Sequence, residues 1–362
     1  MSYSPFRHVD SIFWKHNPIH LTLFLTKRCN ARCPFCFYLS ADNYASAEAA
    51  ELTLEEIEKV SSSMGNLLWL ALSGGELFLR KDLYEIVEVF YAQNKPAIIL
   101  MPTNGLLTDV VRNQAEKILQ HCKNSVVTIK LSLDGPEEIH DAIRGVKGSF
   151  RKMMETYRAL GELIDKYPNF ELGINSVFCS INQDYMDEIL QIVGSLDKIK
   201  THTVSLIRGD VSDGALKEVD TEKYHRLIEK MATDLRDKKA PTYRFKGARL
   251  KAAQDIVQRR LIYETQVKNK QIIPCYAGKL NIVITEAGDV YPCEFFTPKM
   301  KLGNVRKDGY NIKEMLKTTQ AREVVRSIRE KGCFCTHECY FMINILFNPT
   351  MYPALLKEYV KI

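Results

Sequence analysis

Short apolar runs alternate with amphipathic stretches along the first two thirds of the chain, and this alternation predicts the fold. Six runs suit buried strands: His20 to Leu25, Trp69 to Ser73, Ala97 to Thr103, Val126 to Leu133, Leu172 to Phe178 and His202 to Ile207. Apolar residues recur at helical spacing between them, over Asp109 to His121, Phe150 to Tyr167 and Asp184 to Leu196. Strands that alternate with helices predict parallel β/α units, whose working loops follow the C-terminal strand ends.

Helix starts and turn residues complete the expected layout. Thr53 with Glu56, and Asp82 with Glu85, have the spacing of capping boxes. Beyond the strands, a charged helical region precedes a predicted hairpin and a helix over Ile312 to Glu330. We expect an irregular arm over 1–18, a β/α domain over 19–215, a helical bridge over 216–270, an auxiliary domain over 271–345 and a tail over 346–362.

Composition narrows the class of protein without naming a site. The chain has 362 residues, 46% of them hydrophobic and 26% charged, which is typical of a globular protein of about two domains. Its net charge of +6 is modest, so a nucleic-acid partner is not expected. We expect a cytoplasmic protein, since the chain shows no signal peptide and no apolar run long enough to span a membrane.

Ten cysteines, several of them grouped, point to metal rather than to disulfides in a reducing compartment. Cys29, Cys33 and Cys36 are spaced CxxxCxxC directly after the first strand. Three thiolates on one tight loop can hold three irons of a [4Fe–4S] cluster and leave the fourth iron open. Zinc or buried core thiols are the alternatives, although zinc sites usually show paired knuckles and the next cysteine, Cys122, is far downstream.

Two more features lie at the same predicted end of the strands. Ser73-Gly74-Gly75-Glu76 closes the second strand, where glycines let a backbone edge approach a ligand. On the fourth strand, Lys130, Ser132 and Asp134 share one face, which indicates a polar lumen. The alternative for Asp134 is a simple turn with Gly135 and Pro136.

With these motifs, residues 18–210 resemble the radical S-adenosylmethionine (radical SAM) enzymes, whose core is a partial (β/α)6 barrel. The resemblance implies a [4Fe–4S] cluster on the three cysteines, chelated by S-adenosylmethionine, which is cleaved to a 5′-deoxyadenosyl radical. It also implies a set of cofactor-binding residues: Phe35, Ser73, Gly74, Gly75, Glu76, Asn104, Ser132, Asp134, Arg144 and Asn175. Simple packing is the alternative for Phe35, and a surface position is the alternative for Arg144.

A second cysteine group resembles the SPASM/twitch auxiliary domains of that family. Cys275 and Cys293 frame the predicted hairpin, and Cys333, Cys335 and Cys339 follow the helix after it. Five cysteines are too few for two more clusters, so we expect one auxiliary [4Fe–4S] cluster. Its expected ligands are Cys275, Cys293, Cys339 and either Cys335 or Cys333, with zinc as the alternative metal.

The expected fold is therefore α/β, a partial (β/α)6 TIM-type barrel followed by a small α+β auxiliary-cluster domain with a β-hairpin. Cys122 and Cys179 are expected to be ordinary core or surface thiols, and the apolar tail from Tyr340 is expected to cover the auxiliary cluster. Association of this tail with a membrane surface ranks lower, because two prolines interrupt it.

The expected function is that of a radical SAM oxidoreductase or maturase that abstracts hydrogen from a peptide or a small molecule. Its expected partner is a reductant such as flavodoxin or ferredoxin. Only about twenty residues precede the barrel, and the lack of a peptide-recognition domain there weighs against a peptide. A non-catalytic iron–sulfur electron-transfer or carrier protein is the alternative, and it would not need Gly74 to Glu76. The substrate and product, the fate of S-adenosylmethionine and the oligomeric state stay open at this point.

Overall fold

Six consecutive parallel strands form the central sheet in the computed structural model, which describes residues 3–39, 51–330 and 332–362. Each strand pairs with the next one along the chain. The strands are β1 (His20–Phe24), β2 (Trp69–Ser73), β3 (Ile98–Thr103), β4 (Val126–Ser132), β5 (Phe170–Phe178) and β6 (Thr201–Leu206). This order confirms the expected partial (β/α)6 barrel and brings the C-terminal strand ends together.

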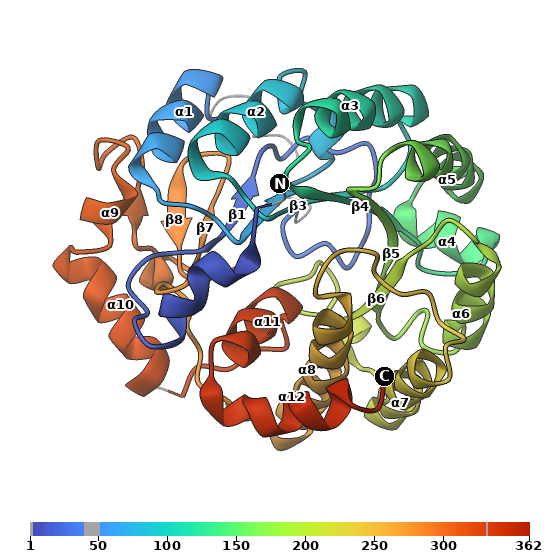
Figure 1. Cartoon of the computed structure of the whole chain (residues 1–362). Helices are drawn as coiled ribbons and strands as arrows, with labels where there is room; N and C mark the ends of the chain where they lie inside the picture. Colours follow the sequence, from blue (N-terminus) through green and yellow to red (C-terminus); the bar gives the residue numbers. More distant parts are fainter. Residues whose placement is uncertain (1–2, 40–50, 331) are drawn as a thin grey trace.

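Helices cover the outside of this sheet (Figure 1). They are α1 (Leu54–Ser63), α2 (Leu83–Asn94), α3 (Thr108–His121), α4 (Glu137–Arg144), α5 (Ser149–Lys166) and α6 (Met186–Ser195). The predicted alternation along β4 is confirmed, since Val127, Ile129 and Leu131 are fully buried in the core whereas Lys130 and Ser132 line a cavity. The side chains that carry chemistry therefore lie inside the barrel.

The C-terminal third extends the same sheet. β7 (Asn281–Ile284) pairs in parallel with β1, and β8 (Asp289–Tyr291) and β9 (Gly303–Asn304) follow in antiparallel order. The predicted hairpin is thus confirmed, but it covers the free edge of β1 instead of standing apart as a separate sheet. The auxiliary domain is consequently held at a fixed position beside the barrel.

Four C-terminal helices complete the ring in Figure 1 by filling the gap beside β6. They are α7 (Thr221–Arg236), α8 (Ala248–Lys268), α11 (Glu338–Leu346) and α12 (Tyr352–Tyr359). The helix expected over 312–330 is two helices, α9 (Ile312–Met315) and α10 (Thr319–Glu330). Its break has a local cause, because the Thr318 hydroxyl accepts a hydrogen bond from the Ala321 N–H, at 3.2 Å, and starts the second helix.

Short 3₁₀ turns connect these elements. They are η1 (Pro5–Ile12), η3 (Leu77–Leu79), η4 (Gly214–Lys217), η5 (Pro298–Met300) and η6 (Pro349–Met351). Within the three described ranges, no helix has both the length and the apolar composition needed to cross a membrane.

Of the two predicted capping boxes, one is confirmed and one is wrong. The Thr53 hydroxyl accepts from the Glu56 N–H at 3.2 Å, and the Thr53 N–H donates to the Glu56 carboxylate at 2.9 Å. Asp82 makes no capping hydrogen bond, because Arg80 engages both of its carboxylate oxygens, at 2.8 and 2.7 Å. A bidentate ion pair replaces the expected cap.

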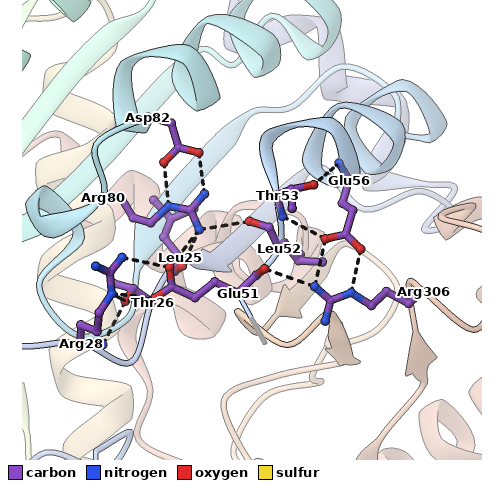
Figure 2. Close-up of polar contacts among 10 residues, drawn as sticks. All are labelled: Leu25, Thr26, Arg28, Glu51, Leu52, Thr53, Glu56, Arg80, Asp82 and Arg306. Carbon is purple, nitrogen blue, oxygen red and sulfur yellow. Dashed lines mark hydrogen bonds and ion pairs between the residues drawn. The ribbon is translucent and has the colours of Figure 1, made fainter. Parts of the chain in front are cut away.

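Arg80 and Arg306 tie the base of the cysteine loop to its surroundings (Figure 2). The Arg80 side chain is buried and also donates to the carbonyls of Leu25 and Leu52, at 3.2 and 3.1 Å. On the other side of α1, Arg306 donates to both oxygens of Glu56, at 2.7 and 2.9 Å. These contacts join the end of β1, the start of α1 and the auxiliary domain, so the loop that follows β1 starts from a rigid base.

The Glu56 carboxylate is expected to stabilise the fold in a pH-dependent way. Hydrogen bonds from Arg306, from the Thr53 N–H and from Tyr310 hold the pKa of Glu56 at about 2, below its ordinary value of 4.5. Because the folded-state pKa is depressed, this stabilisation is present above about pH 4.5 and is lost as the pH falls toward 2. Glu56→Gln should lower the free energy of unfolding by about 1 kcal/mol at pH 7, with a smaller difference at pH 3.

Urea unfolding of both proteins at the two pH values measures this effect. Glu55→Gln is the matched control, because that side chain is 77% exposed and its one ion pair among the described residues is with Lys59. A Glu56→Gln effect of the same size at pH 3 and pH 7 would contradict the prediction.

Candidate functional site

A cavity of about 330 Å³ lies inside the barrel and collects nearly all of the predicted cofactor residues. Its lining includes Cys29, Cys33, Phe35, Cys36, Ser73, Gly74, Gly75, Glu76, Asn104, Ser132, Arg144 and Asn175. These residues come from the ends of five different strands and the loops after them, as a parallel barrel requires. Asp134 is the one predicted cofactor residue that does not line it.

The three-cysteine loop presents its thiols to this cavity. The Cys29 sulfur accepts from the Ala31 N–H at 3.4 Å, and the Cys33 sulfur accepts from Arg144 Nη1 at 3.5 Å. Burial raises the pKa of Cys29 to about 11, so bare thiols would stay protonated here. Iron ions bound at this place would favour the thiolate form and offset that cost. The Arg144 Nε atom is buried without a hydrogen-bond partner among the described residues, which leaves a donor for a bound group.

Gly74 and Gly75 are required by the backbone of the cysteine loop. A Cβ atom on Gly74 would lie 2.5 Å from the Thr26 carbonyl oxygen, and one on Gly75 would lie 2.1 Å from that of Arg28. The close approach is held by hydrogen bonds from the Gly75 N–H to Thr26 O, at 2.7 Å, and from the Glu76 N–H to Arg28 O, at 2.9 Å. The turn after β2 and the chain leading into Cys29 are therefore one braced unit.

Glu76 is almost completely buried and its carboxylate is already engaged inside the protein. It accepts from the Thr103 hydroxyl at 2.9 Å, from the Asn104 N–H at 2.8 Å and from the Phe78 N–H at 3.3 Å. Burial nevertheless raises the pKa of this carboxyl. Through these bonds Glu76 positions Asn104, whose amide donates to Asn30, at 2.7 Å, within the cysteine loop.

Asp134 lies behind Arg144 rather than in the cavity. Its side chain is fully buried, forms an ion pair with Arg144 and accepts from the Val177 N–H at 2.8 Å. The carboxylate therefore holds the arginine that reaches Cys33 and also binds the backbone of β5 near its end, rather than forming a turn with the residues that follow it. Resemblance to the family could not separate a residue that contacts the cofactor from one that supports a neighbour.

Asp134→Asn keeps the shape of this side chain but removes the counter-charge of a buried arginine. We expect the free energy of unfolding to fall by about 3 kcal/mol, since an unpaired buried charge costs about that much. We also expect less iron to be retained after gel filtration, because Arg144 would no longer be held against Cys33. Asp109→Asn, an exposed change, is the control. Unfolding curves that coincide for the two variants would contradict this assignment.

The second cysteine group divides in two in the structure. Cys275, Cys293, Cys333 and Cys335 line one small pocket of about 100 Å³, whereas Cys339 lines the barrel cavity. Burial raises the pKa of Cys293 well above its usual value, and the other three thiols of this pocket add to the effect. The sequence analysis had grouped Cys339 with Cys275 and Cys293.

Helix geometry explains the separation of Cys339. On α11, Cys339 and Met342 are three residues apart and both face the barrel cavity. Tyr340 and Asn344, four residues apart, both face the four-cysteine pocket, as Phe341 also does. The Tyr340 hydroxyl is buried there without a hydrogen-bond partner in the described chain, which fits a pocket built to hold a group with acceptor atoms. Among the described residues, no three His, Cys, Asp or Glu side chains form a site for a single metal ion.

A charged wall also lines the barrel cavity, and sequence reasoning missed it. Its members are Arg208, Glu294, His337 and Glu338. Arg208 donates to Glu294 at 3.1 Å and lies 3.6 Å from Glu338, and His337 contacts Glu294. Burial opposes the charge, yet His337 and Arg208 hold the pKa of Glu294 at about 2. Glu294, His337 and Glu338 lie within two residues of a cysteine in the sequence, and that proximity could have identified them. For Arg208 the sequence offers only its position after the sixth predicted strand.

Lys130 provides a polar floor for the same cavity. Its side chain reaches Thr203 on β6, and burial lowers the pKa of Lys130 to about 8. Lys251 and Asp255 of α8 also line the cavity and form an ion pair with each other. The cavity is therefore lined by thiols and by both positive and negative side chains.

Comparisons with known proteins agree with this arrangement. The family model described as "Radical SAM superfamily" matches residues 23–176, and the SPASM model, described as "Iron-sulfur cluster-binding domain", matches residues 275–340. The subtilosin biosynthesis protein AlbA of Bacillus subtilis is 27% identical over 301 residues, covering 81% of this chain and 58% of AlbA. The pre-heme d1 synthase of Dinoroseobacter shibae is 29% identical over 213 residues, covering 57% of this chain and 48% of the synthase.

A solved structure shares the fold. The anSMEcpe enzyme with bound AdoMet and Kp18Cys peptide superposes with a TM-score of 0.63 at 20% identity, covering 95% of this chain and 100% of that one. The chain spans about half the length of the curated relatives it matches.

Proposed function

Because the chain belongs to the radical SAM superfamily and carries a C-terminal SPASM domain, we propose that it abstracts hydrogen from an organic substrate held between two iron–sulfur sites. The observation that supports this most is the shared cavity, which is lined both by Cys29, Cys33 and Cys36 and by the charged wall, most of which comes from the SPASM domain. An electron-transfer or carrier protein would not need an enclosed space between the two sites.

The first site is proposed to hold a [4Fe–4S] cluster on Cys29, Cys33 and Cys36, with S-adenosylmethionine beside it. When bound and reduced, this pair supplies a 5′-deoxyadenosyl radical that takes a hydrogen atom from a C–H bond. The chain holds the loop in place through Gly74 and Gly75, orients Cys33 through Arg144, and offers Ser132, Asn175 and Phe35 to the cofactor.

The second site is proposed to hold one auxiliary [4Fe–4S] cluster, which would accept one electron from the substrate radical left by hydrogen abstraction, or would coordinate that species. The ligand set that the geometry supports is Cys275, Cys293, Cys333 and Cys335. This set leaves out Cys339 and includes both Cys333 and Cys335, which the sequence analysis had treated as alternatives for one position. Tyr340 and Phe341 cover the pocket from α11 and exclude water from it.

The substrate is proposed to be a peptide. Arg208 Nε and Glu338 Oε1 in the charged wall are buried without hydrogen-bond partners among the described residues, and amide groups of a bound peptide would satisfy both. AlbA acts in the biosynthesis of a bacteriocin and anSMEcpe binds a peptide, which supports the same class. The relation to pre-heme d1 synthase keeps a small molecule as the competing class.

We further propose that the chain works in the cytoplasm with flavodoxin or ferredoxin as its reductant. This proposal follows from the chemistry, since a radical SAM cluster must be reduced by one electron and thiolate ligands persist in a reducing compartment. A reduced flavodoxin that replaces dithionite in turnover would support it.

A deuterium-transfer experiment tests the substrate class. Extracts of source cells grown in deuterated medium are separated into peptide and small-molecule fractions and incubated anaerobically with the reconstituted enzyme, S-adenosylmethionine and dithionite. We expect deuterium in 5′-deoxyadenosine with the peptide fraction only, and none with the Cys29/Cys33/Cys36→Ala variant. Deuterium from the small-molecule fraction alone would overturn the peptide proposal, and none from either fraction would argue against hydrogen abstraction.

A further inference from the structure

A second and larger cavity, of about 850 Å³, lies at the opposite end of the barrel. Trp69, Ile98 and Val126 line it, and these are the first residues of β2, β3 and β4, far along the strands from the cysteine loop. The other walls come from η1, the start of α8, and helices α11 and α12. Figure 1 shows the N-terminal segment lying beside α11, with α12 close to it.

The lining of this cavity is strongly apolar from its floor to its rim. Leu68, Ala97 and Met342 form a buried floor. At the rim, Phe6 is 63% exposed and Leu356 is 62% exposed. Folded proteins seldom leave large apolar side chains around an open hollow unless a ligand or partner covers them. The exposed residues Phe13 and Trp14 follow directly after η1 and extend the apolar surface near the same segment.

Charged groups around the cavity all have one sign. Lys123, Lys246 and Lys251 line it, and no Asp or Glu does so within the described ranges. Lys251 is already paired with Asp255, but Lys123 and Lys246 are exposed and have no ion-pair partner among the described residues. An occupant with a negative group would therefore be attracted to this rim.

The shape and chemistry of the cavity favour a hydrocarbon chain over a peptide. A bound peptide brings an N–H and a carbonyl at nearly every residue, and these need hydrogen-bond partners when buried. Most of the lining surface is apolar, although Ser4, His8 and Asn169 are among the residues that line it, and a hydrocarbon chain needs no hydrogen-bond partner there. The volume of about 850 Å³ is also within the range of about 300–1,000 Å³ that ligand sites usually have.

We propose that this cavity binds a single-chain anionic amphiphile, such as a long-chain carboxylate or alkyl phosphate. The hydrocarbon chain lies along the floor between η1 and α12, and the negative head lies at Lys123 and Lys246. The site is close to the catalytic cavity, because Trp69, Phe245 and Met342 line both spaces. This binding does not depend on the radical chemistry proposed above, and its failure would leave that chemistry intact.

Fluorescence titration with 11-(dansylamino)undecanoic acid, kept below its micelle concentration, tests the proposal on the reconstituted full chain. We expect saturable binding at one site per chain, and displacement by dodecanoate but much less by dodecanol. Lys123→Glu/Lys246→Glu should weaken binding at least tenfold. The matched control is Lys307→Glu/Lys313→Glu, which reverses two exposed lysines near α9 and should change binding less than twofold.

A second pair of variants separates the chain-binding part of the site from its charges. Leu356→Asp places an acid on the apolar rim at an exposed position and should abolish binding without loss of folding. Val267→Asp is the control, because that residue is 54% exposed near the far end of α8.

Titration curves that do not saturate, or that are unchanged by both rim variants, would overturn the proposal. Binding to anionic vesicles without binding to the free amphiphile would overturn it in favour of a membrane surface, and a concentration-dependent dimer that Leu356→Asp dissociates would overturn it in favour of a second copy.

Discussion

Cys335→Ala is expected to remove about half of the iron from the reconstituted protein, whereas Cys339→Ala is expected to remove none. Two [4Fe–4S] clusters correspond to about eight iron atoms per chain, so the expected values are about four and about eight. The difference follows from placement, because Cys335 shares a pocket with Cys275, Cys293 and Cys333 while Cys339 faces the barrel cavity. On α11, Cys339 faces the barrel cavity together with Met342, whereas Tyr340 faces the four-cysteine pocket together with Asn344.

Iron and sulfide analysis, combined with electron paramagnetic resonance of the reduced proteins, measures this contrast. The Cys339→Ala variant should keep both cluster signals and alter activity only through the substrate cavity. Cys122→Ala, at a buried cysteine outside both groups, controls for a general loss of stability. If Cys339→Ala lost about four irons and Cys335→Ala kept all of them, the ligand set proposed for the auxiliary cluster would be wrong. Zinc in place of half of the iron in the wild type would favour the zinc alternative.

Gly75→Ala is expected to destabilise the protein by about 3 kcal/mol or more and to empty the first cluster site. The added Cβ would lie 2.1 Å from the Arg28 carbonyl oxygen, a backbone atom that cannot move without displacing Cys29. Overpacking of this kind costs about 1–3 kcal/mol when side chains can adjust and more when backbone must shift. The hydrogen bonds at Thr26 and Arg28 would break as well.

Thermal unfolding of the apoprotein and iron content after reconstitution give the two readouts. Gly65→Ala is a matched control, because a Cβ there meets nothing within 4 Å. We expect the control to keep its iron and its unfolding temperature. A Gly75→Ala protein with normal stability and full iron would show that the turn after β2 does not brace the cysteine loop.

Much of the barrel could be predicted from the sequence because buried parallel strands are short, apolar and regularly spaced. β2 begins and ends at the expected residues, and the other five strands differ by only one or two. The eight-residue helix α4 was not predicted, since it is too short to show a clear period. The parallel pairing of β7 with β1 was also not predicted, because strand neighbours that are distant in sequence leave no local pattern.

The site divides in the same way between local motifs and long-range contacts. Cys29, Cys33, Cys36 and Gly74 to Glu76 carry their chemistry in adjacent residues and were found directly. By contrast, Asp134 and Cys339 were placed by analogy or spacing, and only the fold shows that one lies behind Arg144 and that the other faces the barrel. The place of Arg208 in the site is recognised only from its hydrogen bond to Glu294, which lies 86 positions away in the chain.

Formation of 5′-deoxyadenosine tests the central claim most directly. The anaerobically reconstituted chain is mixed with S-adenosylmethionine and dithionite, and the product is measured against a Cys29/Cys33/Cys36→Ala control that retains the auxiliary cysteines. The account predicts 5′-deoxyadenosine from the wild type, none above background from the control, and about four irons remaining in that control. A wild type with about eight irons that forms no more 5′-deoxyadenosine than the control would contradict it.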